Sequence, residues 1–263
     1  MINIDNYAYL SKLKKTDPMQ KLLFALLTLG VCLWANSIAI SVLVLFIMGW
    51  VTVCRGGTPP ALFMKLLLVP MSFLVIGVLT IAVNASDNPG VFIFSVYAAG
   101  THIGVSLAGI HNAVRLFFKA LGAVSCLYYL SLSTPMVDLL GALRRLKVPK
   151  LLVELMGLIY RFIFVLLETA DTMHTAQDSR LGYSSLSSGY RSLGALASTL
   201  FIRAYKRSDE LYTALEARGY DGELNVLEEP FNVRWTGYAA AVLVNLALIL
   251  AALLMPQLTG GLL

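Results

Sequence analysis

The fold class is decided by residues 22–54, which read LLFALLTLGVCLWANSIAISVLVLFIMGWVTVC. Nearly every residue in this stretch is apolar. As a single helix it would be about 50 Å long, whereas the hydrocarbon core of a bilayer is about 30 Å thick. The stretch must therefore fold back on itself, and Asn36-Ser37 is the natural place for the break. It predicts two short membrane spans, near 20–36 and 38–54.

The whole chain has the composition of an integral membrane protein. Of its 263 residues 58% are hydrophobic and only 13% are charged, whereas soluble domains carry about a quarter charged residues. The first 21 residues show no cleavable signal pattern, so the first apolar segment is expected to remain as an anchor. The net charge of +5 is expected from basic cytoplasmic segments and does not indicate nucleic-acid binding. Cys32, Cys54 and Cys126 are far apart in sequence, which favours small buried side chains over a disulfide or a metal site.

Three further spans complete the predicted membrane part. The segment 61–84 is apolar, with Pro70 as an expected kink, and 104–132 and 235–255 are apolar over similar lengths. The polar residues 84–90 predict an external loop. The apolar segment 91–103 is too short for a span, which favours an interfacial or re-entrant piece.

From residue 133 onwards the chain becomes more polar. Thr134 and Pro135 are typical of a helix start, and Pro149 is expected to open a long helix that runs to about Arg180. A second long helix, at about 191–218, carries apolar residues at near-helical spacing, which predicts an amphipathic helix. These apolar residues are Leu193, Leu196, Leu200, Ala204, Leu211 and Leu215.

The distribution of basic residues sets the predicted topology. The segment 151–167 is apolar enough to cross the bilayer, but crossing would place the basic residues on either side of it in opposite compartments. The positive-inside rule favours a helix that does not cross. We therefore predict an all-α membrane protein with about five spans, its N-terminus inside and its C-terminus outside. Its domains are a membrane lobe, 1–132, a cytoplasmic arm of long amphipathic helices, 133–231, and a last transmembrane helix, 232–263.

Both long helices of the predicted arm end in the same way. The first ends at Asp178-Ser179-Arg180-Leu181-Gly182 and the second at Glu216-Ala217-Arg218-Gly219-Tyr220, 38 residues later. A cation in the last turn and a nearby glycine also occur at ordinary helix ends, so either arginine alone has a structural explanation. The pair favours a function, because two guanidinium forks on one arm can clamp a partner in a defined orientation.

Other candidate sites have weaker signals. No phosphate-binding loop, zinc-protease motif or nucleophile elbow is present, so any ATP must be bound by another subunit. Glu168, Asp171, His174 and Asp178 recur at helical spacing, but a solvated helix face explains them better than a metal site does. The pair Arg115 and Lys119 lies within a predicted span, where cations are costly; function and interfacial snorkelling explain the pair equally well.

The chain resembles the transmembrane T component of energy-coupling factor transporters, in its cobalt-transport (CbiQ-like) branch. The resemblance covers most of the chain and is strongest over 133–220. The residues that carry it are Asp5, Ala8, Pro18, Lys21-Leu22, Ser133-Thr134-Pro135, Leu143-Arg144-Arg145-Leu146, Val148-Pro149, Tyr160-Arg161-Phe162, Ala176-Gln177-Asp178-Ser179-Arg180 and Ala214-Leu215-Glu216-Ala217-Arg218-Gly219-Tyr220.

The resemblance implies a coupling subunit without catalytic residues, metal ligands or a cofactor of its own. It implies that Ala217-Arg218-Gly219 and Ser179-Arg180-Leu181 dock with two ABC-type ATPase subunits, which bind ATP and Mg²⁺. The triplet Ala217-Arg218-Gly219 fits the family's Ala-Arg-Gly pattern fully, whereas Ser179-Arg180-Leu181 keeps only the arginine. The membrane part would hold a separate metal-specific, substrate-binding membrane subunit, for cobalt or nickel.

Two other functions remain open on the sequence alone. A self-contained secondary transporter or channel would need polar groups along a path through the membrane, and only Arg115 and Lys119 qualify. An integral membrane enzyme would use Glu168, Asp171 and His174 as a metal-binding face.

Overall fold

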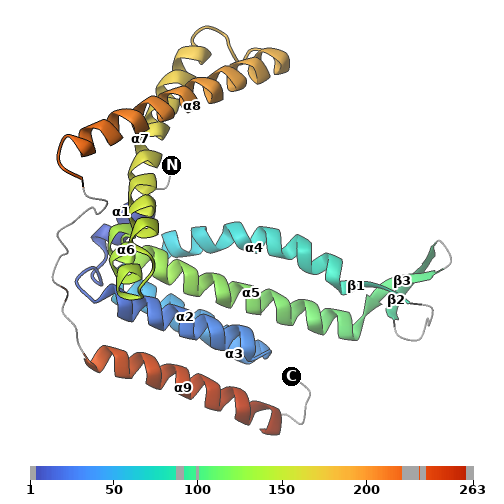
Figure 1. Ribbon diagram of the computed structural model, residues 1–263. Helices are drawn as coiled ribbons and strands as arrows, with labels where there is room; N and C mark the ends of the chain where they lie inside the picture. Colours follow the sequence, from blue (N-terminus) through green and yellow to red (C-terminus); the bar gives the residue numbers. More distant parts are fainter. Residues whose placement is uncertain (1–3, 87–91, 99–100, 221–230, 232–234, 259–263) are drawn as a thin grey trace. The chain divides into compact units, whose positions relative to one another are not determined.

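The protein is a chain of helices with one small sheet, seen in a computed structural model that describes residues 4–86, 92–98, 101–220, 231 and 235–258 (Figure 1). The helices are α1 (Ile4–Leu10), α2 (Pro18–Trp34), α3 (Ile38–Trp50), the π-helix η1 (Val51–Arg55), α4 (Pro60–Ala82), α5 (Leu107–Ser133), α6 (Met136–Arg145), α7 (Lys150–Asp178), α8 (Leu186–Glu216) and α9 (Trp235–Leu258). The strands are β1 (Val83–Ser86), β2 (Phe92–Ala98) and β3 (Thr101–Ser106). The predicted class, an all-α membrane protein, is confirmed.

The chain forms two compact units. The bundle unit contains Met1–Ala142 and Pro230–Leu263, and the arm unit contains Leu143–Glu229. The functional division into a lobe, a cytoplasmic arm and a last span remains a prediction.

The break between the first two spans lies where the sequence places it. Asp17 caps α2, since its side chain accepts a hydrogen bond of 3.3 Å from the backbone N–H of Met19, and Pro18 occupies the first turn. Asn36 adopts a left-handed conformation with φ 42°, which asparagine tolerates better than most residues. The chain therefore turns there, and α3 begins at Ile38. The 17 residues of α2 extend about 25 Å.

Four described helices are long and apolar enough to cross a membrane. They are Ile38–Arg55, Pro60–Ala82, Leu107–Ser133 and Trp235–Leu254, and the shorter apolar helix α2 accompanies them. These helices correspond to the five predicted spans, and α4 continues through Pro70. Within the described segments α7 does not meet the same criteria, although it has 29 residues.

The segment after α4 forms β-strands. Within the predicted interfacial or re-entrant piece 91–103, the described residues 92–98 and 101–103 belong to an antiparallel sheet in the order β1-β3-β2, and the place of this piece relative to the membrane stays a prediction. Val83 pairs with Val105, and Ala98 pairs with Thr101. A short apolar run does not distinguish helix from strand by its periodicity, and β-branched and aromatic residues favour the strand. Of the predicted loop 84–90, residues 87–90 lie outside the described residues.

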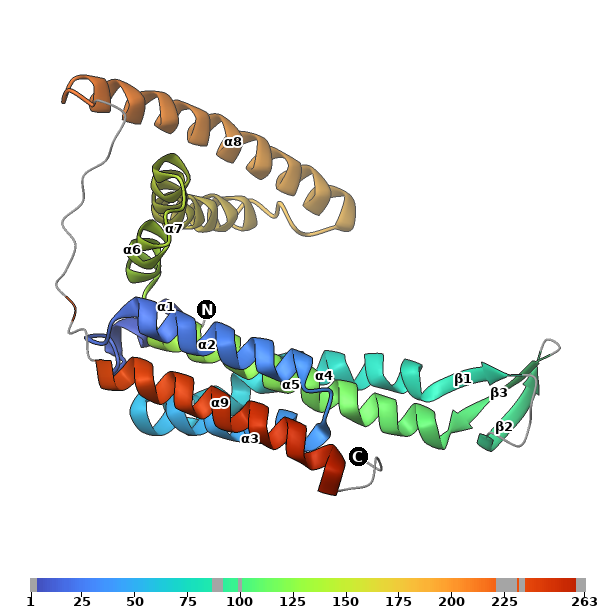
Figure 2. The ribbon, with the colours of Figure 1, turned by 60° about the horizontal axis from the view of Figure 1, so that its bottom comes forward.

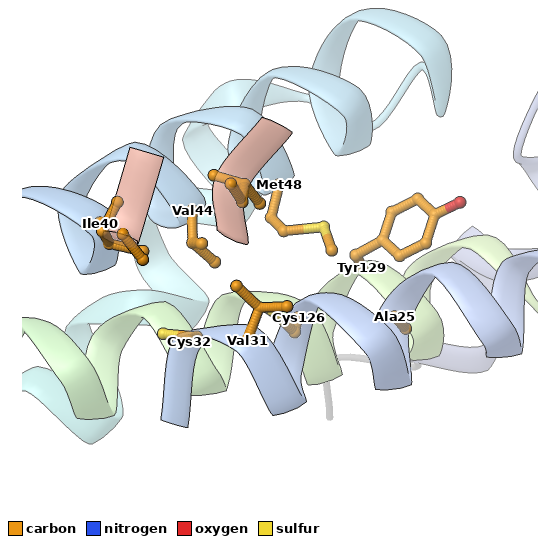
Figure 3. Close-up of a cluster of buried hydrophobic side chains, with 10 residues drawn as sticks. Ala25, Val31, Cys32, Ile40, Val44, Met48, Cys126 and Tyr129 are labelled. Atoms are coloured by element: carbon orange, nitrogen blue, oxygen red, sulfur yellow. The ribbon is translucent and has the colours of Figure 1, made fainter. Parts of the chain in front are cut away.

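The bundle unit has two core clusters, one built from α2, α3, α5 and α9 and the other from α4 and α5. Figure 3 shows Ile40, Val44 and Met48 of α3 facing Cys32 of α2 and Cys126 of α5. These side chains are buried, so the prediction of buried cysteines is confirmed for both thiols. It is wrong for Cys54, which is exposed in the π-helix η1, where an apolar neighbourhood in sequence does not guarantee a place in the core.

The helices of the bundle unit do not all end at the same distance along the bundle. Figures 1 and 2 show α4 and α5 extending past the turn that joins α2 to α3, with the sheet at their far end. This follows from their lengths, because α5 has 27 residues and spans about 40 Å.

Candidate functional site

The two arginine-bearing helix ends have the same backbone geometry. After α7, the N–H of Arg180 donates to the carbonyl of Gln177 and the N–H of Gly182 donates to the same carbonyl, at 3.2 and 2.8 Å. After α8, the N–H groups of Arg218 and Tyr220 both donate to the carbonyl of Leu215, at 3.0 Å each. The remaining bonds of the two turns also match at the 38-residue offset. Arg180 and Arg218 therefore occupy equivalent positions in two copies of one turn.

The left-handed position of this turn holds different residues in the two copies. It is Gly219, with φ 72°, after α8, but Leu181, with φ 59°, after α7. The left-handed residue after α7 is therefore not its glycine, Gly182. Gly182 is needed for close approach instead, because a Cβ there would lie 2.8 Å from both the carbonyl oxygen of Gln177 and Oγ of Ser192.

The predicted site residues all face outwards. Ser179, Arg180, Leu181, Ala217, Arg218 and Gly219 are all exposed. Over the described part of the chain, neither Arg180 nor Arg218 has a hydrogen bond or an ion pair from its guanidinium group. The five N–H donors of each guanidinium group are therefore not used by any of the residues that the structure describes.

A hydrogen-bonded corner joins α7 to α8 just after Arg180. The side chains of Ser188 and Ser192 both donate to the carbonyl of Gly182, at 2.9 Å each. The amide of Gln177 donates to the carbonyl of Ser192 at 3.1 Å and accepts a bond of 2.7 Å from the hydroxyl of Tyr183. These bonds fix the first turn against the start of α8.

The second turn lies at the other end of α8. The 31 residues of α8 extend about 45 Å, so the two arginine turns are separated by roughly that length. The hydroxyl of Tyr220 donates to the carboxylate of Glu154 at 3.3 Å, which ties the second turn to the beginning of α7. Both turns are thus held on the helices, at opposite ends of α8.

The corner gives a direct prediction for Gly182→Ala. The added methyl group would collide with the carbonyl of Gln177 and with Ser192, at a cost of about 2 kcal/mol for overpacking. We expect the amides of residues 182–192 to exchange with deuterated solvent roughly 30-fold faster. Gly194→Ala is the matched control, because its Cβ would meet no atom within 4 Å, and exchange should be unchanged or slower. Equal exchange in both variants would contradict this role of Gly182.

The amphipathic prediction for α8 is confirmed for most of its residues. Leu196, Leu200, Ala204, Leu211 and Leu215 are partly buried, whereas Leu193 is 51% exposed. Beyond these, Phe201 and Tyr205 are exposed on α8, and Ile159 is exposed on α7. The arm unit therefore presents apolar side chains on both of its long helices.

The other candidate residues are not brought together as a site. Glu168, Asp171, His174 and Asp178 are exposed. Among the residues described, no group of three or more histidine, cysteine, aspartate or glutamate side chains could hold a metal ion. The ring of His174 stacks on Tyr183 at 4.5 Å between centroids.

One signal of the repeated turn was present in the sequence but was not used in the prediction. Asp171 and Thr175 precede Arg180 at the same distances at which Asp209 and Thr213 precede Arg218. In both copies the threonine hydroxyl donates to the aspartate carbonyl, at 2.9 and 3.0 Å. The repeat therefore includes the last turns of both helices.

Comparison with known proteins agrees with this architecture. The family model of the cobalt transport protein CbiQ matches residues 10–228. An uncharacterised protein of Methanocaldococcus jannaschii is 37% identical over 225 residues, which is 86% of this chain and 83% of the relative. The cobalt transport protein CbiQ of Salmonella typhimurium is 35% identical over 60% of this chain and 70% of its own length.

A relative named for a different transporter matches nearly the full length. The energy-coupling factor transporter transmembrane protein EcfT of Bacillus subtilis is 30% identical over 93% of each chain. With its apolar helices and its match to the family model over most of its length, the chain belongs to the CbiQ family of cobalt transport proteins, the T components of energy-coupling factor transporters.

Proposed function

We propose that this chain is the membrane-embedded coupling subunit of an ATP-driven energy-coupling factor importer for cobalt or nickel. The observation that carries the proposal is the pair of equivalent, exposed turns that present Arg180 and Arg218 at opposite ends of α8. Two copies of one turn fit two copies of one partner surface. The partners are two ABC-type ATPase subunits, which bind ATP and Mg²⁺.

The chemistry of the turns supports docking. A guanidinium group is planar and always charged, and it can bind a carboxylate or helix-end carbonyls through two parallel bonds. In each turn the arginine lies beside a backbone whose hydrogen bonds are already made within the chain, so the fork does not need to stabilise its own helix end. The arginines can therefore transmit a displacement of the ATPases to α7 and α8.

The apolar surface of the arm unit supports a second contact. Ile159, Ile163 and Phe164 of α7 and Phe201 of α8 are exposed, and such surface is usually covered by a protein or by lipid. We propose that a metal-specific, substrate-binding membrane subunit covers part of it, so that movement of the arm reorients that subunit. In this topology the arm and the N-terminus are cytoplasmic and the C-terminus is outside.

The substrate class comes from the relatives. The family model and three relatives carry cobalt transport in their names, and metal selectivity would lie in the substrate-binding subunit. In this proposal the chain itself is not an enzyme and binds no cofactor.

Reconstitution tests the proposal. The chain would be placed in vesicles with its cassette ATPases and its metal-binding subunit, and ATP-dependent uptake of ⁵⁷Co²⁺ would be measured. We expect uptake that requires every component. Uptake by the chain alone, driven by an ion gradient, would contradict the proposal and would support a self-contained transporter.

A further inference from the structure

Two cations lie in the bundle unit with only neutral partners. Nζ of Lys119 donates to Oδ1 of Asn36 at 2.6 Å, and Nη2 of Arg115 donates to Oδ1 of Asn112 at 3.1 Å. Lys119 and Arg115 are one turn apart on α5, so their side chains lie on the same face. Each retains unused donors, since an ammonium group has three and a guanidinium group has five.

Few acidic residues lie near these two cations in the sequence. Arg115 and Lys119 are the only arginine and lysine between Leu66 and Leu143, and only the acids Asp87 and Asp138 accompany them. The structure gives no ion pair to either cation in its described part. A positive pair held only by amide oxygens keeps donors that can bind an anion from outside the chain.

The turn at Asn36 sets the depth of this pair. Irregular backbone exposed to lipid does not occur within the hydrocarbon region, so the turn between α2 and α3 must lie at the level of the headgroups. Lys119 reaches this turn, and Arg115 lies one turn nearer the start of α5. Both cations are therefore at headgroup level, although α4 and α5 continue beyond the turn (Figure 2).

The residues beside the cations suit an acyl chain. Ile110, Val114 and Leu116 are 40%, 37% and 45% exposed on the same helix. Apolar side chains next to a cationic pair at headgroup level match a molecule with a negative head and an apolar tail. A soluble anion would use the cations but not this surface.

We propose that Arg115 and Lys119, with Asn36 orienting Lys119, bind the phosphate group of an anionic phospholipid at the end of the bundle where α2 turns into α3. The lipid offsets one of the two positive charges and fixes the membrane boundary on α5. This site is independent of the docking role of the arm.

Lipid retention by the purified full chain tests the proposal. The chain would be equilibrated in mixed micelles with equal amounts of phosphatidylglycerol and phosphatidylcholine, and bound lipid would be counted by native mass spectrometry. We expect the wild-type chain to retain phosphatidylglycerol preferentially. Arg115→Gln and Lys119→Gln should each weaken this retention about fivefold, because a cation at a membrane surface contributes about a factor of five.

Matched variants and a second measurement make the outcome decisive. Arg203→Gln/Lys206→Gln removes two exposed cations from α8 and should leave the preference unchanged. The charge-conserving Arg115→Lys/Lys119→Arg should largely restore it. A wild-type chain without preference for phosphatidylglycerol would overturn the proposal without any variant. Full displacement of the lipid by 10 mM inorganic phosphate would overturn the lipid assignment, and so would retention in the complete transporter only, which would indicate a partner's carboxylate.

Discussion

Reversing the charge at both arginine turns, with Arg180→Glu and Arg218→Glu together, is expected to abolish ATP-driven metal uptake while the chain still inserts into the membrane. Both side chains are exposed and make no bond within the described chain, so the change leaves the turns themselves intact. At a docked interface an arginine that binds an acidic or carbonyl group typically contributes about 2 kcal/mol or more, and a glutamate there repels the same group.

The two single variants separate the roles of the two turns. If each turn docks with one ATPase, Arg180→Glu and Arg218→Glu should each weaken ATPase capture and lower uptake at least tenfold, without preventing insertion. Arg218→Lys keeps the charge but loses the planar fork, so an intermediate loss is expected. Uptake of ⁵⁷Co²⁺ and co-purification of the ATPases are the two measurements.

A matched control uses arginines of the same unit. Arg191→Glu/Arg203→Glu makes the same change in net charge at exposed positions of α8 between the two turns. This variant should assemble and transport at nearly the wild-type rate. Normal assembly and transport by the Arg180→Glu/Arg218→Glu variant would show that the turns do not dock.

Most of the membrane helices could be predicted from the sequence, because the length and hydropathy of an apolar segment determine whether it can cross the bilayer. A run of 33 residues, nearly all of them apolar, is too long for one span, and Asn36 provides the turn. The sheet at β1–β3 was not accessible, because Phe92–Ala98 is apolar without a clear period and its strand depends on pairing with a segment that follows it. The exposure of Cys54 could not be predicted either, because it depends on how the helices pack against one another.

The residues of the candidate site could be predicted from the sequence, but the backbone geometry of the two turns could not. The recurrence of arginine after 38 residues pointed to Arg180 and Arg218. That Leu181 occupies the left-handed position could not be foreseen, because leucine disfavours this conformation and Gly182 stands next to it. Gly182 has to stand where it does because its N–H bonds to the carbonyl of Gln177 and because Ser192 leaves no room for a Cβ there. The left-handed position then falls on Leu181.

The second large effect is expected at a buried lysine in the bundle unit. Lys21 is only 1% exposed, and its ammonium group donates to the carbonyls of Ser133 and Leu13 at 2.8 and 3.2 Å. The carboxylates of Asp138 and, to a smaller extent, Asp17 lie close enough to interact with this charge. Asp17 is 2% exposed and accepts a hydrogen bond of 2.6 Å from the hydroxyl of Tyr238. The lysine thus joins the start of α2 to the end of α5, and Asp17 extends the network to α9.

Lys21→Met should lower the free energy of unfolding by about 3–5 kcal/mol, because it leaves the carboxylates of Asp138 and Asp17 without this cation and two carbonyls without their donor. Thermal unfolding of the purified chain in detergent measures this loss. Lys65→Met removes an exposed lysine from α4 and should change stability by less than about 0.5 kcal/mol. In Lys21→Met/Asp17→Asn one of the two carboxylates that interact with the lysine is neutral, so the double variant should be more stable than the sum of the two single losses predicts. If Lys21→Met unfolds at the same temperature as Lys65→Met, the lysine does not hold α2 and α5 together.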